Sequence, residues 1–140
     1  MTAELKRIGS ADIETHWSVL ESYLAPAMRR GDSPLSSDDL KALALAGKRL
    51  LLAVVDGDDL LAVASTGIRS GRDGDVAFVD FCGGEGMGRW LRPCLIDLER
   101  RAKEAGAVAF EIEEGRTGFR RLLADYRPVR VVLRKELTDG

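Results

Sequence analysis

Apolar residues in the first third of the chain recur at intervals of four, three and four, the spacing of one face of an α-helix. The residues of this set are Ile13, Trp17, Leu20 and Leu24. Ser10 is a typical N-cap for such a helix, and Pro26 should end or kink it. The pattern then predicts a second, shorter helix that starts at Ser36 or Ser37 and stops at Gly47.

The middle of the chain has the pattern of paired strands. Leu50–Val55 is a continuous apolar run, Asp56–Asp59 supplies turn residues, and Leu60–Ala64 begins the return strand. This succession predicts a β-hairpin. A second polar, glycine-containing connection, Arg69–Gly74, leads to another apolar strand, Asp75–Cys82. Three sequential strands with short links form an antiparallel meander.

The last part of the chain begins with a glycine-rich segment, Gly83–Gly88, that cannot continue the strand before it. Arg89–Ala105 has the spacing of an amphipathic helix, and Ala107–Glu113 reads as a strand. Strand, helix and strand in this order imply a right-handed crossover with parallel pairing. A short helix over Thr117–Asp125 and a final strand over Val129–Leu133 complete the pattern.

The glycine-rich segment is the first candidate for a functional site. A glycine loop that feeds a helix start can bind an anion, because the first N–H groups of a helix lack internal partners. A phosphate-bearing ligand is therefore one hypothesis, and a flexible turn without a ligand is the other. Arg89 could reinforce phosphate binding or be a solvated residue of the first helical turn.

Composition narrows the class of protein. The 140 residues fit one domain, 1–140, with a single core, and 45% hydrophobic with 31% charged residues is ordinary for a globular protein. No apolar run approaches the roughly 20 residues that span a bilayer, and the first residues lack the apolar core of a secretory signal, so we expect a cytoplasmic protein. One histidine and two cysteines, Cys82 and Cys94, indicate neither a metal site nor a disulfide framework.

Charge bears on the choice of partner. The net charge is −2, which argues against general nucleic-acid binding. Basic residues nevertheless gather between Arg116 and Lys135, where Asp125 is the single acid. This basic segment could attract an anionic partner, or it could be the solvated face of a helix and an edge strand. A final strand rich in Val and Arg could equally be a protected edge or the contact of a homo-oligomer.

The order of elements resembles the GNAT acetyltransferase fold, an α/β (α+β) fold with a mixed sheet. In this order, two helices are followed by an antiparallel meander, a glycine loop into a crossover helix, and then strand, helix and strand. The residues that carry the resemblance are Val76–Phe81, Gly86 to Gly88 and Glu113–Tyr126. The fold implies an acyl-CoA-dependent N-acyltransferase in which an amine attacks the thioester directly. Acetyl-CoA is the implied donor, and the acceptor amine is not identified by the residues.

The resemblance also implies which residues bind the cofactor. The loop amides would hold the pyrophosphate of acetyl-CoA, and its pantetheine arm would lie between the strand ending at Cys82 and the strand starting at Ala107. An extended, amide-bearing chain can pair with the exposed groups of such strands like an added strand. The implied cofactor-binding residues are Phe81, Cys82, Gly83, Gly84, Gly86, Met87, Gly88, Arg89 and Trp90.

Two positions depart from the family pattern. Gly83 stands where the loop signature has Gln or Arg, and Arg121 stands where many members place a thiol-protonating tyrosine. Arginine cannot act as an acid at neutral pH. Transfer from an ammonium also requires a general base, and the candidates are Asp80, Glu111 and Glu113. Each of these could instead be a solvent-facing carboxylate at a strand end.

The departures supply an alternative function. The segment Gly115–Phe119 and the basic end of the chain also look like small GNAT-like proteins encoded by phages and prophages. The alternative is a catalytically degenerate GNAT-fold protein with a structural or partner-binding role, associated with a virion rather than with the cytoplasm.

Overall fold

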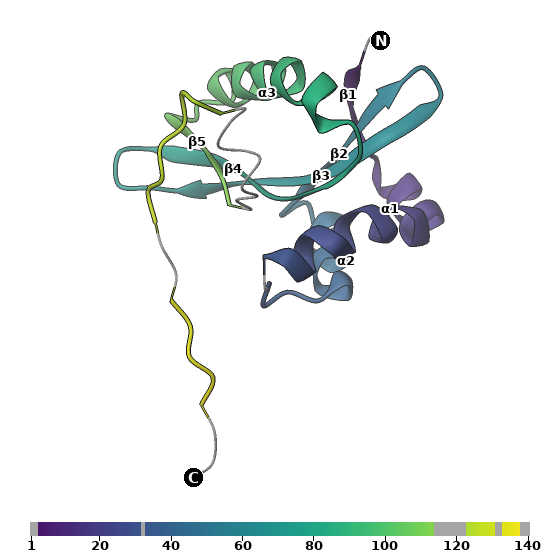
Figure 1. The fold of residues 1–140 in the computed structure, drawn as a ribbon, viewed down its shortest axis with the longest axis horizontal. Helices are drawn as coiled ribbons and strands as arrows, with labels where there is room; N and C mark the ends of the chain where they lie inside the picture. Colours follow the sequence, from purple (N-terminus) through teal and green to yellow (C-terminus); the bar gives the residue numbers. More distant parts are fainter. Residues whose placement is uncertain (1–2, 32, 114–122, 131–132, 138–140) are drawn as a thin grey trace.

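The computed structural model describes residues 3–31, 33–113, 123–130 and 133–137. Its centre is a sheet in the order β1-β2-β3-β4-β5 (Figure 1). The strands are β1 (Glu4–Arg7), β2 (Leu50–Asp56), β3 (Asp59–Ser70), β4 (Asp75–Gly84) and β5 (Ala109–Ile112). Neighbours are antiparallel except β4 and β5, which are parallel. The meander and the parallel crossover predicted from the sequence are both confirmed.

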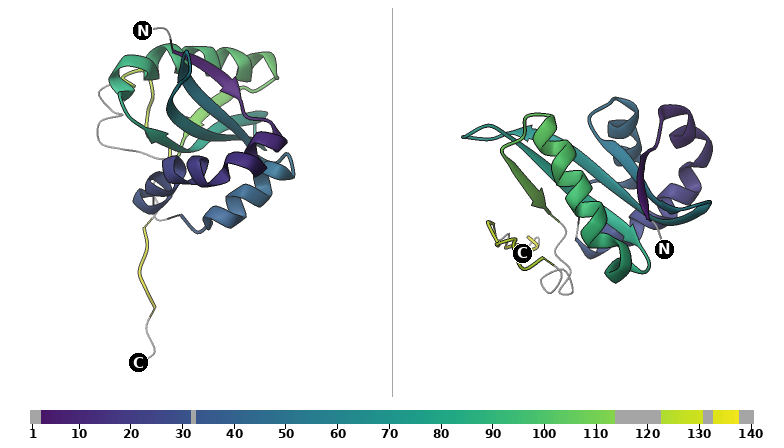
Figure 2. Two further views of the ribbon diagram at one scale, coloured as in Figure 1. Left: turned by 90° about the vertical axis from the view of Figure 1, so that its right-hand side faces the viewer. Right: turned by 90° about the horizontal axis from the view of Figure 1, so that it is seen from above.

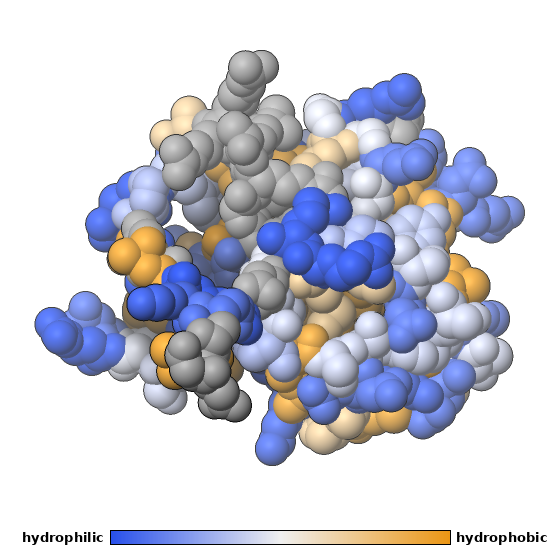
Figure 3. All heavy atoms as spheres, turned by 60° about the horizontal axis from the view of Figure 1, so that its bottom comes forward, coloured by the Kyte–Doolittle hydropathy of each residue, from blue (hydrophilic) through white to orange (hydrophobic). Residues whose placement is uncertain are grey.

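Helices cover both faces of the sheet, with α1 (Ser10–Arg30) and α2 (Ser37–Leu45) on one face and α3 (Met87–Glu104) on the other (Figures 1 and 2). Each layer encloses its own apolar core. The helical layer of α1 and α2 packs on Val63 and Phe81, and α3 packs on Ala64 and Cys82. The outer surface seen in Figure 3 is largely hydrophilic with small hydrophobic patches, as expected of amphipathic helices.

Several predicted boundaries in the helices were wrong. Helix α1 is capped by Gly9 rather than Ser10, and it continues through Pro26 to Arg30. Its irregular residue is His16, which has non-helical backbone angles. The continuation past Pro26 is tolerated because tertiary packing outweighs one lost N–H donor: Leu24, Ala27 and Met28 are buried around it.

Strand β1 was missed by sequence reasoning. Its four residues, Glu4–Arg7, contain a single apolar side chain, Leu5, so no period-2 pattern could be read. It pairs with β2 from Glu4↔Val55 to Arg7↔Leu52. Short, charged strands are common at sheet edges because they discourage association with other chains.

The C-terminal predictions are tested in part. The strand expected over Ala107–Glu113 is present as Ala109–Ile112. The helix expected over Thr117–Asp125, including Arg121, lies mostly outside the described residues, and residues 124–125 form a turn. Val129, Arg130 and Leu133 are not in a strand. None of the described helices is long and apolar enough to cross a membrane.

Candidate functional site

Strand β4 extends beyond its parallel neighbour. The last registered pair is Val79↔Ile112, and the N–H of Glu113 donates to the Val79 carbonyl at 2.8 Å. Strand β4 then continues to Gly84 while still paired with β3 on its other side. Within the described part of the chain, residues 80–84 have no strand partner on the β5 side. This is the open edge that an extended amide chain could pair with.

The glycine loop after β4 is held in place by its neighbours. The Glu85 N–H donates to the Leu61 carbonyl at 3.2 Å, and the Trp90 indole N–H donates to the Glu85 carbonyl at 2.7 Å. Gly86 caps α3 in the left-handed conformation, with φ +68°, which glycine adopts without strain. The loop is therefore an ordered entry into α3 rather than a flexible turn.

The start of α3 faces open space at Gly88. A Cβ added to Gly88 would meet no atom within 4 Å, and both Gly88 and Arg89 are exposed. Helix α3 has no side-chain cap. The Arg89 N–H donates to the Gly86 carbonyl at 2.9 Å, so within the described residues it is the N–H groups of Met87 and Gly88 that remain for an external acceptor. An acceptor outside the protein can therefore approach the start of α3 at Gly88, as an anion does at other helix N-termini.

Most of the other predicted cofactor residues can contribute only their backbone. The side chain of Phe81 packs in the core under α1 and α2, while Cys82 and Trp90 are buried in the core under α3. Met87 packs against the same α3 core, and Gly84 lies close to β3, where a Cβ would be 2.3 Å from the Leu61 carbonyl oxygen. These side chains hold the loop rather than line it.

Gly83 is the point at which α1 touches β4. A Cβ at this position would lie 1.7 Å from the carbonyl oxygen of Tyr23. Beside this contact is a cavity of about 500 Å³ between the second half of α1 and the glycine loop, lined in part by Tyr23, Pro26, Leu61 and Gly84.

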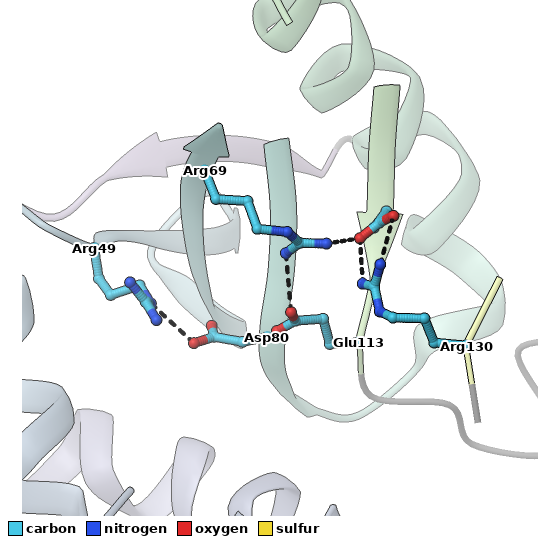
Figure 4. Close-up of polar contacts among 6 residues, drawn as sticks. Arg49, Arg69, Asp80, Glu113 and Arg130 are labelled. Atoms are coloured by element: carbon cyan, nitrogen blue, oxygen red, sulfur yellow. Dashed lines mark hydrogen bonds and ion pairs between the residues drawn. The ribbon is translucent and has the colours of Figure 1, made fainter. Parts of the chain in front are cut away.

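Two of the three carboxylates predicted as candidate bases, Asp80 and Glu113, lie in one network of polar contacts with arginines (Figure 4). The third, Glu111, shares Arg69 with Glu113, and it alternates with Phe110 and Ile112, which pack on the α3 side. Each is paired with arginine. Arg49 donates from Nε to Asp80 Oδ2 at 3.0 Å, and Arg69 donates to Glu113 Oε1 at 3.1 Å.

Glu111 lies between two guanidinium groups. Arg69 contacts its Oε1, and Arg130 contacts both of its oxygens. The network thus balances three carboxylates with three arginines. In the described part of the chain, no group of three or more His, Cys, Asp or Glu side chains could hold a metal ion.

Sequence reasoning missed the arginines and an aromatic ring at the centre of this network. The guanidinium carbons of Arg49 and Arg69 lie 4.9 and 5.1 Å from the centre of the Phe78 ring, within the range of cation–π attraction. The ring tip occupies the space left by Gly67, whose Cβ would be 2.6 Å from Phe78 Cζ. Only the strand pairing brings these residues together, so no local signal in the sequence could have identified them.

The C-terminal segment is fastened to α3 at Asp125 and Tyr126. Arg92 donates to Asp125 Oδ1 at 2.8 Å, and the Tyr126 hydroxyl donates to Glu99 Oε1 at 2.9 Å. Burial and then the bond to Glu99 raise the pKa of Tyr126. The Tyr126 hydroxyl therefore stays protonated and hydrogen-bonded to Glu99 on α3.

Replacing Tyr126 with Phe should lower the free energy of unfolding by about 1 kcal/mol near neutral pH, the usual worth of one hydrogen bond. Because the pKa of Tyr126 is raised in the folded state, this contribution is complete below the unfolded tyrosine pKa of about 10 and is lost as the pH rises above it. Urea unfolding of both proteins between pH 7 and 11 should show the difference narrowing. A constant difference across this range would contradict the assignment.

No protein-family model matches the sequence, and no curated protein matches it significantly. Solved structures do resemble it. A GNAT family acetyltransferase from Staphylococcus aureus is 15% identical over 98% of this chain and 100% of its own, with a TM-score of 0.62. Aminoglycoside N-acetyltransferase AAC(6')-Iy, in complex with CoA, is 13% identical over 96% and 95%, with a TM-score of 0.68.

A third similar structure is an aminoglycoside acetyltransferase from a soil metagenomic sample, in complex with sisomicin. It is 11% identical over 97% of both chains, with a TM-score of 0.68. Together these similarities show that the chain has the GNAT fold, as its sequence predicted.

Proposed function

We propose that the protein is an N-acyltransferase that takes its acyl group from a CoA thioester, with acetyl-CoA as the donor. The observation that carries the proposal is the succession of two features: the end of β4, which among the described residues has no strand partner on the β5 side, and the start of α3 at Gly88, which has no side-chain cap. A ligand with a pantetheine arm and a pyrophosphate matches both at once. The shared fold with a CoA-bound acetyltransferase supports this reading.

In the proposed reaction, the acceptor amine attacks the thioester carbon directly. The register shift between β3 and β4 leaves Asp80 without a registered partner, and bulges of this kind free backbone N–H groups from the ladder. Such an N–H can polarise the thioester carbonyl as negative charge develops on its oxygen. A carboxylate among Asp80, Glu111 and Glu113 would take the proton from the amine.

Calorimetric titration with acetyl-CoA and CoA tests the first step. Gly88→Val should weaken binding by at least about tenfold, because the added side chain occupies the space before the α3 N–H groups. Gly9→Val is the matched control: Gly9 also lies at the start of a helix, as the N-cap of α1, and its Cβ also meets no atom within 4 Å. It should bind as the natural protein does.

No heat at millimolar acetyl-CoA in the natural protein would overturn the proposal. Equal weakening in both valine variants would show that the loss comes from helix capping rather than from the loop. Aminoglycosides are the first acceptors to test, because two of the similar structures are aminoglycoside acetyltransferases. The cavity of about 500 Å³ beside the loop could receive part of such an acceptor.

A second function is favoured by the arginine pairing of the candidate bases. Glu111 has both oxygens engaged by arginine, and the position expected to hold a thiol-protonating tyrosine carries Arg121. These features suit a GNAT-fold binding or assembly protein, such as one encoded by a phage. It would bind CoA weakly or not at all and transfer no acyl group to any amine.

A further inference from the structure

The two buried oxygens nearest the β4 bulge have no hydrogen-bond partner among the described residues. Ser65 is fully buried and Asp80 is 5% exposed, and Ser65 Oγ and Asp80 Oδ1 are both unsatisfied. Ser65 pairs with Phe81, the residue after Asp80. Burying polar oxygens without partners is costly, so this placement suggests a ligand that completes them.

Both side chains lie on the face covered by α1 and α2. Ser65 alternates with Ala64, which belongs to the α3 core, and shares its face with Val63 in the α1 core. On this face Arg49 binds Asp80 and lies over the Phe78 ring. The register shift leaves Asp80 opposite the step between Ser65 and Thr66 on the neighbouring strand.

The other two carboxylates are already satisfied. Glu111 accepts from Arg130 through both oxygens and forms an ion pair with Arg69. Glu113, which is more exposed, accepts from Arg69. Asp80 alone combines burial, one oxygen fixed by arginine and one oxygen left free. Arg49 is fixed in turn by stacking on Phe78.

We propose that Asp80 Oδ1 and Ser65 Oγ bind the reacting ammonium of the acceptor, with Asp80 as the proton acceptor and Arg49 as its positioning residue. This inference rests on the proposed function and assigns the base among three candidates. Because both oxygens are enclosed, only a slender group can reach them. The acceptor class is therefore a primary amine on an unbranched carbon, rather than a secondary or branched amine.

The proton and bond changes balance as follows. The ammonium gives one proton to Asp80, and the free amine forms a bond to the thioester carbon. The carbon–sulfur bond breaks, and the second proton on nitrogen ends on the departing CoA thiolate. Asp80 returns its proton to water. The products are the amide, CoA thiol and one proton.

The experiment measures acetyl transfer to n-butylamine, N-methylbutylamine and tert-butylamine by release of CoA thiol. Asp80→Asn should lower kcat for n-butylamine by about 100-fold or more, while calorimetry shows unchanged binding of acetyl-CoA. Ser65→Ala should lower transfer by about tenfold and raise Tm by about 4 °C, since it removes an unsatisfied hydroxyl. N-methylbutylamine and tert-butylamine should be poor substrates.

Two further readouts separate proton transfer from structural damage. The defect of Asp80→Asn should shrink as the pH approaches about 10, where an alkylamine is increasingly unprotonated. The charged groups facing or adjoining Asp80 that could alter this profile are Arg49, Arg69, Glu111 and Glu113. Arg49→Ala should lose kcat, and Arg49→Lys should recover at least part of it. Asp97→Asn, an arginine-paired carboxylate on α3, is the matched control.

Several outcomes would overturn the inference: an active Asp80→Asn variant, a pH-independent defect, or an equal or larger loss in Glu113→Gln. If the natural protein binds acetyl-CoA but acetylates no amine, the proposed function fails at transfer. Binding of an ammonium at Asp80 and Ser65 is then tested separately. The CoA complex is titrated with n-butylammonium, and the Asp80 carboxyl group is followed by carbon-13 NMR. A saturable shift that Ser65→Ala weakens supports the site, and no shift overturns it.

Discussion

Replacing Gly83 with Ala is expected to destabilise the protein by about 3 kcal/mol or more, the largest stability loss of any single-methyl addition in the glycine loop. The added carbon would lie 1.7 Å from the Tyr23 carbonyl oxygen and 2.8 Å from its carbonyl carbon. Neither atom can move without shifting the backbone of α1, whose packing on β4 would then loosen. Overpacking a rigid site costs about 1–3 kcal/mol, and backbone clashes fall at or above the upper end.

Urea unfolding measures this effect as a fall in the midpoint at constant slope. Gly88→Ala is the matched control, because its Cβ would meet nothing within 4 Å. There, alanine should be neutral or should stabilise by about 0.5 kcal/mol through the unfolded chain. If the free energy of unfolding of Gly83→Ala were within about 1 kcal/mol of that of the natural protein, α1 would be able to move away from β4 at little cost.

This contact also explains why position 83 carries glycine rather than the Gln or Arg of the GNAT loop signature. Gln or Arg at this position would have to displace α1 from the end of β4, because even one carbon does not fit. Glycine here is therefore a packing requirement of this chain's α1, and its presence does not by itself argue against the proposed binding of a ligand at the loop. Gly88 faces open space and Gly86 is an ordered N-cap of α3.

How far the fold could be predicted depended on how local its signals are. The β2–β3 hairpin and α3 follow from continuous apolar runs, turn residues and helical spacing, all within short windows. Strand β1 could not be predicted because Leu5 is its one apolar residue. The path of α1 through Pro26 could not be predicted because packing with the sheet decided it.

The candidate site, too, could be predicted from the sequence only in part. Asp80 and Glu111 could be proposed as bases from their places on two strands that should be neighbours. Their partners, Arg49 and Arg69, precede β2 and end β3, and which carboxylate each arginine takes depends on strand register and on a bulge. The distinction that matters chemically, one free oxygen on Asp80 and none on Glu111, is therefore visible only in three dimensions.

Trp90 should link the stability of the α3 core to ligand binding at the glycine loop. It is 2% exposed, and its indole N–H holds the Glu85 carbonyl at 2.7 Å. Trp90→Ala should cost about 3–5 kcal/mol, as for other buried aromatic residues. Trp90→Phe keeps most of the apolar contact and loses the hydrogen bond, so it should cost about 1 kcal/mol.

The informative result is the affinity of Trp90→Phe for acetyl-CoA. With its anchor removed, the loop must be ordered at Glu85 when the ligand binds, and ordering the backbone of one residue costs about 1–2 kcal/mol. Calorimetry should therefore show binding weakened by about tenfold, while Leu95→Ala, which damages the same core without touching the loop, should leave the affinity of the folded protein unchanged. Equal affinities in the natural protein and Trp90→Phe would mean that the Glu85–Leu61 bond orders the loop alone. A loss in both variants would instead assign the effect to the core.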